Sequence, residues 1–398
     1  MLLTAGTVLT GASTLGPGWV EIESGHIVGV GSGAPARPAD LDLGQAIVAP
    51  GFVDMHVHGG GGGAFFEATD EAVAATLALH RRHGTTAMMA SLVSDQPEAL
   101  VRQVSALADH VTSGDLLGIH LEGPWLAARR CGAHEPTALR DPDPAEIQTL
   151  LEAGRGAVRM VTLAPELPGA IEAIRRIVDA GVVAAIGHTD ATYEQARAAI
   201  DAGATVATHL FNTMRPVHHR DPGPVVAALE DPRVTVELIN DGVHLHPALH
   251  RLVTADVGVD RVALITDAMA AAGMSDGAYH LGSLAVEVTD GVARVAGTDT
   301  IAGSTATMAS VMSQAVTHGA GDREDALLAV IRQACLNPLR ALGLPAAGLA
   351  PGAPADLVVL DTHLGVQGVM RHGAWAHRPR GKISAMGDEG DIGSRPPT

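Results

Sequence analysis

The sequence of 398 residues is long enough for one large α/β domain with a small companion domain. Its formal net charge of −18 argues against nucleic acid or an anionic membrane surface as the main partner. The two cysteines provide no disulfide framework, and the chain contains neither a signal-peptide pattern nor an apolar run of membrane-spanning length, so a cytoplasmic protein is expected.

The only lysine in the chain is Lys382, close to the C-terminus. A catalytic Schiff base, a phosphate-loop lysine and a carboxylated lysine that bridges two metal ions all require a lysine side chain. The sequence therefore excludes these three kinds of site from the body of the protein.

Short strands separated by Gly, Ser and Pro are expected over the first 50 residues. From residue 50 onward, eight apolar runs rich in β-branched residues alternate with helix-patterned segments, which predicts a parallel (β/α)8 TIM barrel. The expected strands are 48–58, 86–93, 116–122, 158–164, 182–188, 205–210, 234–240 and 262–266, and the expected helices are 70–83, 97–111, 144–153, 169–180, 192–202, 224–230 and 247–257.

The remaining elements belong to the C-terminal third of the chain. A hairpin is expected over 279–296, with Asp290-Gly291 as its turn, followed by helices over 304–318 and 323–342. The last strand-like runs, 351–361 and 365–372, should pair with the N-terminal strands. The predicted organisation is a small β-sandwich domain from residues 1–49 and 346–378, a metal-dependent barrel domain from 50–345, and a disordered tail over 379–398.

Metal-ligand side chains stand at the C-terminal ends of the predicted barrel strands, where TIM barrels carry their active sites. His120 and Glu122 share one face of the third strand, and Glu122 is preferred as a ligand because it lies nearer the strand end. The candidates are His56 and His58 at the end of the first strand, Glu122 at the end of the third, His188 at the end of the fifth, His209 at the end of the sixth and Asp267 at the end of the eighth.

Imidazole and carboxylate ligands suit Zn, Fe, Co or Mn better than Ca or Mg. Glu122, His188 and His209 could hold one cation and leave a position for water. Addition of His56, His58 and Asp267 would permit a second cation, with Glu122 as the bridge because no lysine is available. One or two divalent metal ions per subunit are therefore expected, with Zn as the first candidate.

The order and spacing of these motifs resemble the amidohydrolase superfamily. The matching features are PGFVDMHVH over Pro50–His58, the aspartate after the eighth strand and ADLVVL over Ala355–Leu360. More narrowly, the chain to about residue 378 resembles the N-acetylglucosamine-6-phosphate deacetylase family. The narrower motifs are HLEGP over His120–Pro124, GAHEP over Gly132–Pro136, GHT over Gly187–Thr189, THLFNTM over Thr208–Met214, DGVH over Asp241–His244 and TDA over Thr266–Ala268.

The resemblance implies roles for individual residues. Glu122, His188 and His209 match the family's metal triad, and Asp267 matches its catalytic acid and base. An arginine at the position of Arg220 reaches into the neighbouring subunit's site in the family, which implies a homodimer. The residues matched to substrate binding are Ala133, His134, Asn212, Thr213, Arg220, Asp241, His244, Ile301, Ala302 and Gly303, with His134 also expected to take part in catalysis.

The expected reaction is hydrolysis of the N-acetyl group of N-acetyl-D-glucosamine 6-phosphate by metal-activated water. Asp267 would accept a proton from the water and pass it to the leaving amine. Two alternatives stay open from the sequence. The first is another amidohydrolase, of nucleobase deaminase or D-aminoacylase type, and the second is an inactive scaffold with the same fold.

Overall fold

The computed structural model describes residues 1–379 and 382–383. Its largest sheet contains eight parallel strands that neighbour one another in chain order, so the predicted TIM barrel is confirmed. The barrel strands are β8 (Phe52–Asp54), β11 (Thr85–Leu92), β12 (Gly118–Glu122), β13 (Val158–Leu163), β14 (Val183–Ile186), β15 (Val206–Ala207), β16 (Thr235–Ile239) and β17 (Val262–Ile265).

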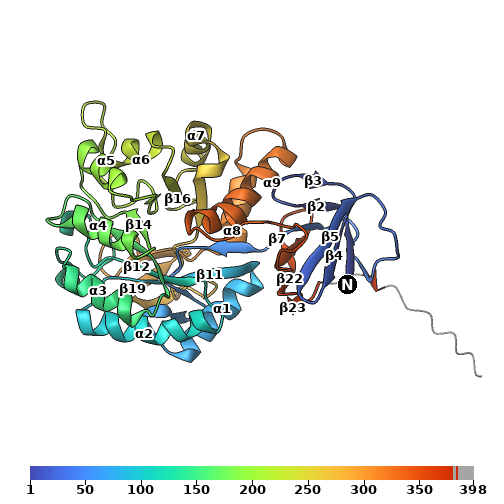
Figure 1. The fold of residues 1–398 in the computed structure, drawn as a ribbon, viewed down its shortest axis with the longest axis horizontal. Helices are drawn as coiled ribbons and strands as arrows, with labels where there is room; N and C mark the ends of the chain where they lie inside the picture. Colours follow the sequence, from blue (N-terminus) through green and yellow to red (C-terminus); the bar gives the residue numbers. More distant parts are fainter. Residues whose placement is uncertain (380–381, 384–398) are drawn as a thin grey trace, which may run out of the picture.

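Helices cover the outside of these strands (Figure 1). Several begin where the sequence supplies a cap: the Thr192 side chain accepts a hydrogen bond from the Gln195 amide, and the Gln195 side chain in turn accepts one from the Thr192 amide. The helices are α1 (Asp70–Arg82), α2 (Pro97–Thr112), α3 (Pro144–Ala153), α4 (Ala170–Asp179), α5 (Tyr193–Asp201), α6 (Gly223–Glu230), α7 (Pro247–Val257), α8 (Met308–Thr317), α9 (Arg323–Ile331) and α10 (Asn337–Ala341), with the π-helical segment η5 (Arg332–Leu336) between the last two and short 3-10 turns η1 (Phe65–Glu67), η2 (Ala128–Arg130), η3 (Pro136–Ala138) and η4 (Val259–Arg261).

The interior of the barrel is filled by methionine and branched aliphatic side chains. Met55, Met89 and Met160 belong to one buried cluster with Ile239 and Ile265. Only 2% of the chain is aromatic, so unbranched methionine occupies the irregular space that larger rings would otherwise fill. This apolar layer leaves the C-terminal ends of the strands for polar groups.

The first and last strands of the barrel meet through specific hydrogen bonds rather than a continuous ladder. The Asp54 carboxylate accepts the Thr266 hydroxyl at 2.5 Å and the Thr266 amide at 3.3 Å. The Asp267 amide donates to the His56 carbonyl at 2.9 Å. Burial raises the pKa of Asp54 to about 7. The closure of the barrel therefore fixes the segment with His56 relative to the one with Asp267.

Strands from both ends of the chain form a β-sandwich beside the barrel (Figure 1). Val48 of the N-terminal segment pairs with Val359 of the C-terminal segment, as predicted. Side chains of the two sheets share one core, which includes Leu3, Val20 and Leu357. One sheet contains β24 (Lys382–Ile383), β6 (Leu41–Asp42), β1 (Leu2–Ala5), β4 (Gly18–Glu23) and β5 (His26–Ser32), and the other contains β23 (Ala374–His377), β22 (Val366–Arg371), β21 (Leu357–Leu360), β7 (Ile47–Pro50), β2 (Thr7–Leu9) and β3 (Thr14–Leu15).

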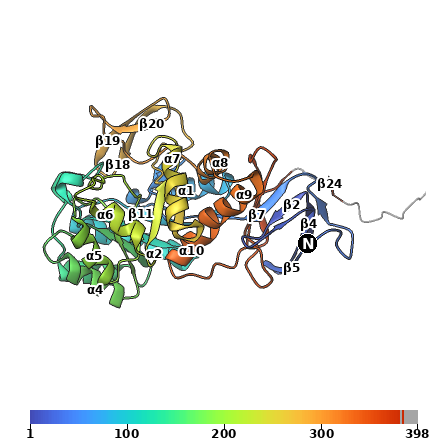
Figure 2. The same cartoon turned by 90° about the horizontal axis from the view of Figure 1, so that it is seen from above.

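A three-stranded antiparallel sheet follows the last barrel strand and projects from one edge of the barrel (Figure 2). Its strands are β18 (Gly277–Leu281), β19 (Leu284–Thr289) and β20 (Val292–Val295). The hairpin prediction was right about the turn at Asp290-Gly291 but missed the third strand. Leu281 and Val286 pack against Val93 and Ala302, so the sheet lies against loops at the barrel mouth.

The structure corrects three predicted elements. The strand expected over 48–58 is interrupted at Gly51, where an added Cβ would lie 2.2 Å from Thr86 Oγ1, and the chain passes there from β7 to β8. The helix expected over 323–342 contains the π-helical segment η5. In the segment 379–398, predicted to be disordered, Lys382–Ile383 pair with β6, while 380–381 and 384–398 lie outside the described residues.

A short sheet of two strands, β9 (Gly59–Gly60) and β10 (Gly63–Ala64), is formed by the glycine-rich segment after His58.

Among the described residues, no helix is long and apolar enough to cross a membrane. The division into domains at residues 49/50 and 345/346 stays a prediction.

His80 of α1 anchors the glycine-rich segment, since its Nε2 donates to the Gly59 carbonyl at 3.0 Å. Burial lowers the pKa of His80 to about 4. In the unfolded chain the His80 side chain is protonated near pH 6.5. Its contribution to the free energy of unfolding is therefore complete above that pH and is lost as the pH falls toward 4.

We expect metal-free wild type to lose about 3 kcal/mol more than His80→Gln between pH 7 and pH 4, because glutamine can donate to Gly59 but does not titrate. Urea unfolding at several pH values measures this difference. If the free energies of unfolding of the two proteins change in parallel with pH, the role of His80 is contradicted.

Candidate functional site

The backbone turns sharply at the ends of three barrel strands. His188, His209 and Asp267 each lie two residues beyond their strand and have positive φ values of 47°, 30° and 51°. This conformation is uncommon for residues other than glycine and is found where the surrounding structure enforces it, often at functional sites. Glu122 needs no such turn because it is the last residue of β12.

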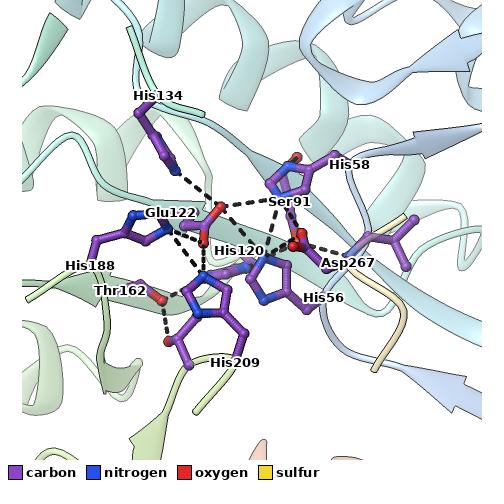
Figure 3. A network of polar contacts seen from close by, with 12 residues as sticks. His56, His58, Ser91, His120, Glu122, His134, Thr162, His188, His209 and Asp267 are labelled. Carbon is purple, nitrogen blue, oxygen red and sulfur yellow. Dashed lines mark hydrogen bonds and ion pairs between the residues drawn. The ribbon is translucent and has the colours of Figure 1, made fainter. Parts of the chain in front are cut away.

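The carboxylate of Glu122 lies between two pairs of imidazole rings (Figure 3). Its Oε1 is 3.1 Å from His188 Nε2 and 2.9 Å from His209 Nε2. Its Oε2 is 3.1 Å from His58 Nε2 and 3.5 Å from His56 Nε2. Each oxygen therefore faces a different pair, as a carboxylate that bridges two cations would.

Asp267 completes one side of this cluster. Its Oδ1 is 3.1 Å from His58 Nε2 and 3.5 Å from His56 Nε2. The two histidines lie beyond the end of β8, not on it as the sequence predicted, and Val57 between them forms an isolated bridge with Ala268. Their side chains nevertheless point to the same face.

The cluster is buried, and its charges are strongly coupled. Burial raises the pKa of Glu122 and of Asp267, but the adjacent imidazoles outweigh it, so the pKa of each carboxyl lies well below its ordinary value. Burial lowers the pKa of His58, but the nearby Asp267 and Glu122 outweigh this effect and raise the pKa to about 9. Two buried carboxylates thus favour positive charge between the rings, which a divalent cation would supply.

In three of these rings the hydrogen bond of Nδ1 determines that the neutral ring has its lone pair on Nε2, the nitrogen that faces Glu122. Nδ1 of His58 donates to the Ser91 carbonyl at 3.1 Å, and Nδ1 of His188 donates to the Arg130 carbonyl at 2.9 Å. Nδ1 of His56 is 3.1 Å from a Glu237 carboxylate oxygen and donates to it. In their neutral forms these rings present Nε2 lone pairs to the centre, as metal-binding histidines do.

In His134 the donor and acceptor roles of the two ring nitrogens are exchanged. Its Nδ1 accepts a hydrogen bond from the Ser94 amide at 3.1 Å, and burial followed by the charge of His188 lowers its pKa to about 4. The neutral ring therefore carries its proton on Nε2, which lies 3.4 Å from Glu122 Oε2. His134 is a hydrogen-bond donor at the edge of the cluster rather than a metal ligand.

The ring of His120 is held by hydroxyl groups on both sides. Its two ring nitrogens contact the hydroxyl of Ser91 at 3.0 Å and that of Thr162 at 2.8 Å. Burial, then the nearby His56, holds the pKa of His120 well below its ordinary value. The ring stacks edge-on beneath His56, with 4.6 Å between their centroids.

These contacts test whether the site can hold a metal. Ligand atoms of His56, His58 and Glu122 lie within 4.8 Å of one another, and so do those of Glu122, His134 and His188. The hydrogen bonding of His134 removes it from the second group, and His209 takes its place beside Glu122 Oε1. The donor set fits a divalent cation.

A cavity of about 260 Å³ opens next to the cluster. The structure brings most of the predicted site residues to its wall and adds several that the sequence did not single out. The predicted residues that line it are His58, Glu122, Ala133, His134, His188, His209, Asn212, Thr213, His244, Asp267, Ile301 and Gly303, and the additional ones are Val93, Gly132, Leu281, Asp299 and Thr300.

Four predicted site residues do not line this cavity. His56 and Ala302 are fully buried and do not contribute to its wall. Asp241 contacts His244 instead, with 2.8 Å between Oδ2 and Nδ1. Burial lowers the pKa of His244, but Asp241 outweighs this effect and raises it, which favours a cationic ring on the cavity wall.

Arg220 is the fourth, and it is exposed on a loop beside His219, with 2.7 Å between its guanidinium and His219 Nε2. Within one chain, Arg220 is therefore not in contact with the cavity described above.

Sequence reasoning missed Glu237, which touches the ring of His56 and the backbone of His209. A charged residue within the apolar strand TVELI was the available signal. Ser94 was missed as well, because a serine after a strand is common and only the three-dimensional contact with His134 reveals its role.

Comparison with known proteins places the chain in the amidohydrolase family. The sequence profile of the amidohydrolase family matches residues 47–390. The chain is 35% identical over 385 residues to N-acetylgalactosamine-6-phosphate deacetylase of Escherichia coli O157:H7, covering 94% of this chain and 99% of that protein. It is 38% identical over 343 residues to N-acetylglucosamine-6-phosphate deacetylase of Homo sapiens, covering 82% of each.

Among solved structures, the fold is similar to that of a variant of N-acetyl-D-glucosamine-6-phosphate deacetylase from Mycobacterium smegmatis in complex with N-acetyl-D-glucosamine 6-phosphate. The TM-score is 0.94 at 63% sequence identity, with 95% of this chain and 99% of that chain covered. The deacetylase of Thermotoga maritima has a TM-score of 0.86 at 30% identity, with 95% and 100% covered.

Proposed function

The chain belongs to the amidohydrolase family, and on that premise we propose that it hydrolyses the acetamido group of N-acetyl-D-glucosamine 6-phosphate, giving glucosamine 6-phosphate and acetate. The observation that carries the proposal is the buried carboxylate of Glu122 between two imidazole pairs, beside a cavity with a histidine that favours positive charge. The relatives that span most of the chain are deacetylases of N-acetylated amino-sugar phosphates.

The cofactor in this proposal is Zn, with Fe, Co or Mn as alternatives of similar ligand preference. One cation would be held by Glu122, His188 and His209. A second would be held by His56 and His58 with the other oxygen of Glu122, and Asp267 would lie within reach of it. Retention of both histidines of the His56-Val57-His58 motif favours two cations per subunit.

The protein's own groups would act around the acetamido carbonyl. When bound, a divalent cation lowers the pKa of a water molecule from 15.7 toward about 7 and polarises a carbonyl oxygen. Asp267 accepts a proton from the attacking water and then donates it to the amine nitrogen as the carbon–nitrogen bond breaks. His134 would donate a hydrogen bond from its Nε2–H to the carbonyl oxygen as negative charge develops there.

Recognition of the sugar phosphate would involve the other side chains of the cavity wall. Asn212 and Thr213 follow shortly after His209 and line the cavity, so their polar groups can hold the sugar. The ring of His244, supported by Asp241, can form a charge-assisted hydrogen bond with a phosphate, worth about 1.5–3 kcal/mol. The backbone of Ala133 and of Ile301–Gly303 would complete the enclosure.

The phosphate requirement separates this function from the nucleobase deaminase and D-aminoacylase alternatives. We expect acetate release from N-acetyl-D-glucosamine 6-phosphate and a drop of at least tenfold in kcat/KM for the unphosphorylated sugar, because His244 loses its partner. Coupled acetate detection measures both, with N-acetyl-D-galactosamine 6-phosphate as a third substrate. Equal turnover with and without phosphate would contradict the proposed recognition.

We further propose a homodimer in which Arg220 contributes to the neighbouring subunit's phosphate site. The support is that Arg220 is exposed and does not line the cavity of its own chain, and that Val217 on the same loop is 53% exposed. An arginine and an apolar side chain together suit a contact with a second copy of the chain.

Mixing of two impaired variants tests this arrangement. Asp267→Asn should abolish turnover because the proton acceptor is lost, and Arg220→Ala should raise KM for the phosphorylated sugar. In a heterodimer one of the two sites regains both native groups, so we expect up to about half of wild-type activity per dimer, measured on purified tagged heterodimers. Absence of recovery in purified heterodimers would assign Arg220 to its own subunit's site.

A further inference from the structure

Glu237 is a charged residue inside the barrel that the proposed reaction does not use. It lies on β16 among Val236, Leu238 and Ile239, and its side chain is fully buried. A carboxylate in such surroundings is costly unless its oxygens are paired, so its presence calls for a physical reason.

The contacts of Glu237 reach both halves of the Glu122 cluster. Its Oε2 accepts a hydrogen bond from His56 Nδ1 at 3.1 Å and another from the His209 amide at 3.1 Å. The Glu237 backbone carbonyl accepts the Leu210 amide at 2.9 Å. Within the described part of the chain, the other carboxylate oxygen, Oε1, has no hydrogen-bond partner.

These bonds act on the two features of the ligands that a cation would depend on. The bond to His56 keeps the proton on Nδ1 and turns the Nε2 lone pair toward Glu122 and Asp267. The bond to His209 holds a backbone with a φ of 30°, which brings the ring to Glu122 Oε1. One carboxylate oxygen thus orients one ligand of each imidazole pair.

We propose that Glu237 is a positioning residue that aligns His56 and His209 for divalent cations and couples the two halves of the site. The proposal rests on the ligand roles given under Proposed function. Glu237 contacts the Nδ1 side of the His56 ring and the backbone amide of His209, so it acts through these two residues rather than as a ligand. Its negative charge strengthens the donor character of His56.

The test compares Glu237→Gln and Glu237→Leu with wild type. Glutamine keeps an oxygen that can accept both hydrogen bonds but removes the charge, whereas leucine removes both. We expect the affinity for Zn²⁺ to fall about 10-fold in the first variant and about 100-fold in the second, measured by competition with a chromophoric chelator. The visible absorption of the Co²⁺-loaded protein should change in the same order.

Asp231→Asn is the matched control. Asp231 is a second buried carboxylate, 3% exposed, which pairs with Arg197 and Arg233 away from the cluster. Its replacement should lower the thermal midpoint of the metal-free protein without any change in Zn²⁺ affinity or in the Co²⁺ spectrum. Loss of folding in Glu237→Leu leaves Glu237→Gln as the deciding variant.

The outcomes separate this proposal from the proposed function. Unchanged Zn²⁺ affinity and Co²⁺ spectrum in Glu237→Gln, with a wild type that binds metal and releases acetate, overturn the role of Glu237 alone. A wild type that binds no divalent cation overturns both. In a His56→Gln background the charge effect of Glu237→Gln should shrink to less than threefold, and a full tenfold effect there would contradict action through His56.

Discussion

The structure depends on one buried carboxylate whose two oxygens face different imidazole pairs. Glu122 is 2% exposed and touches His188 and His209 with one oxygen and His56 and His58 with the other. Burial of two acids with this many rings is unfavourable without compensating positive charge. The donor set therefore suits a divalent cation, and its geometry is a consequence of the barrel rather than of any single motif.

The fold supplies this geometry in layers. Methionine and aliphatic side chains fill the barrel below, the strand ends carry the ligands, and carbonyl or carboxylate acceptors outside the ring fix the tautomers. Hydrogen bonds of Asp54 with Thr266 close the barrel between the strands that precede His56 and Asp267. The chemistry and the closure of the fold thus rest on the same strands.

Much of this was predictable because topology dictates where strand ends meet. Parallel strands bring residues after each strand to one face, so Glu122, His188, His209 and Asp267 could be grouped from spacing alone, and helices α3 and α7 match their predicted bounds. Other features depend on contacts that no local pattern encodes. The donor polarity of His134 follows from the Ser94 amide, and the break at Gly51 follows from the approach of Thr86 across the sheet. The contacts of Glu237 with His56 and with the His209 amide likewise join residues far apart in sequence.

The most direct test of the account is anomalous scattering from crystals of the Zn²⁺-loaded protein, with data collected on both sides of the Zn absorption edge. The account predicts two peaks on opposite sides of Glu122, one beside His188 and His209 and the other beside His56 and His58, each bonded to a different oxygen of the carboxylate. Zn at full occupancy elsewhere, with no peak in contact with Glu122, would contradict it.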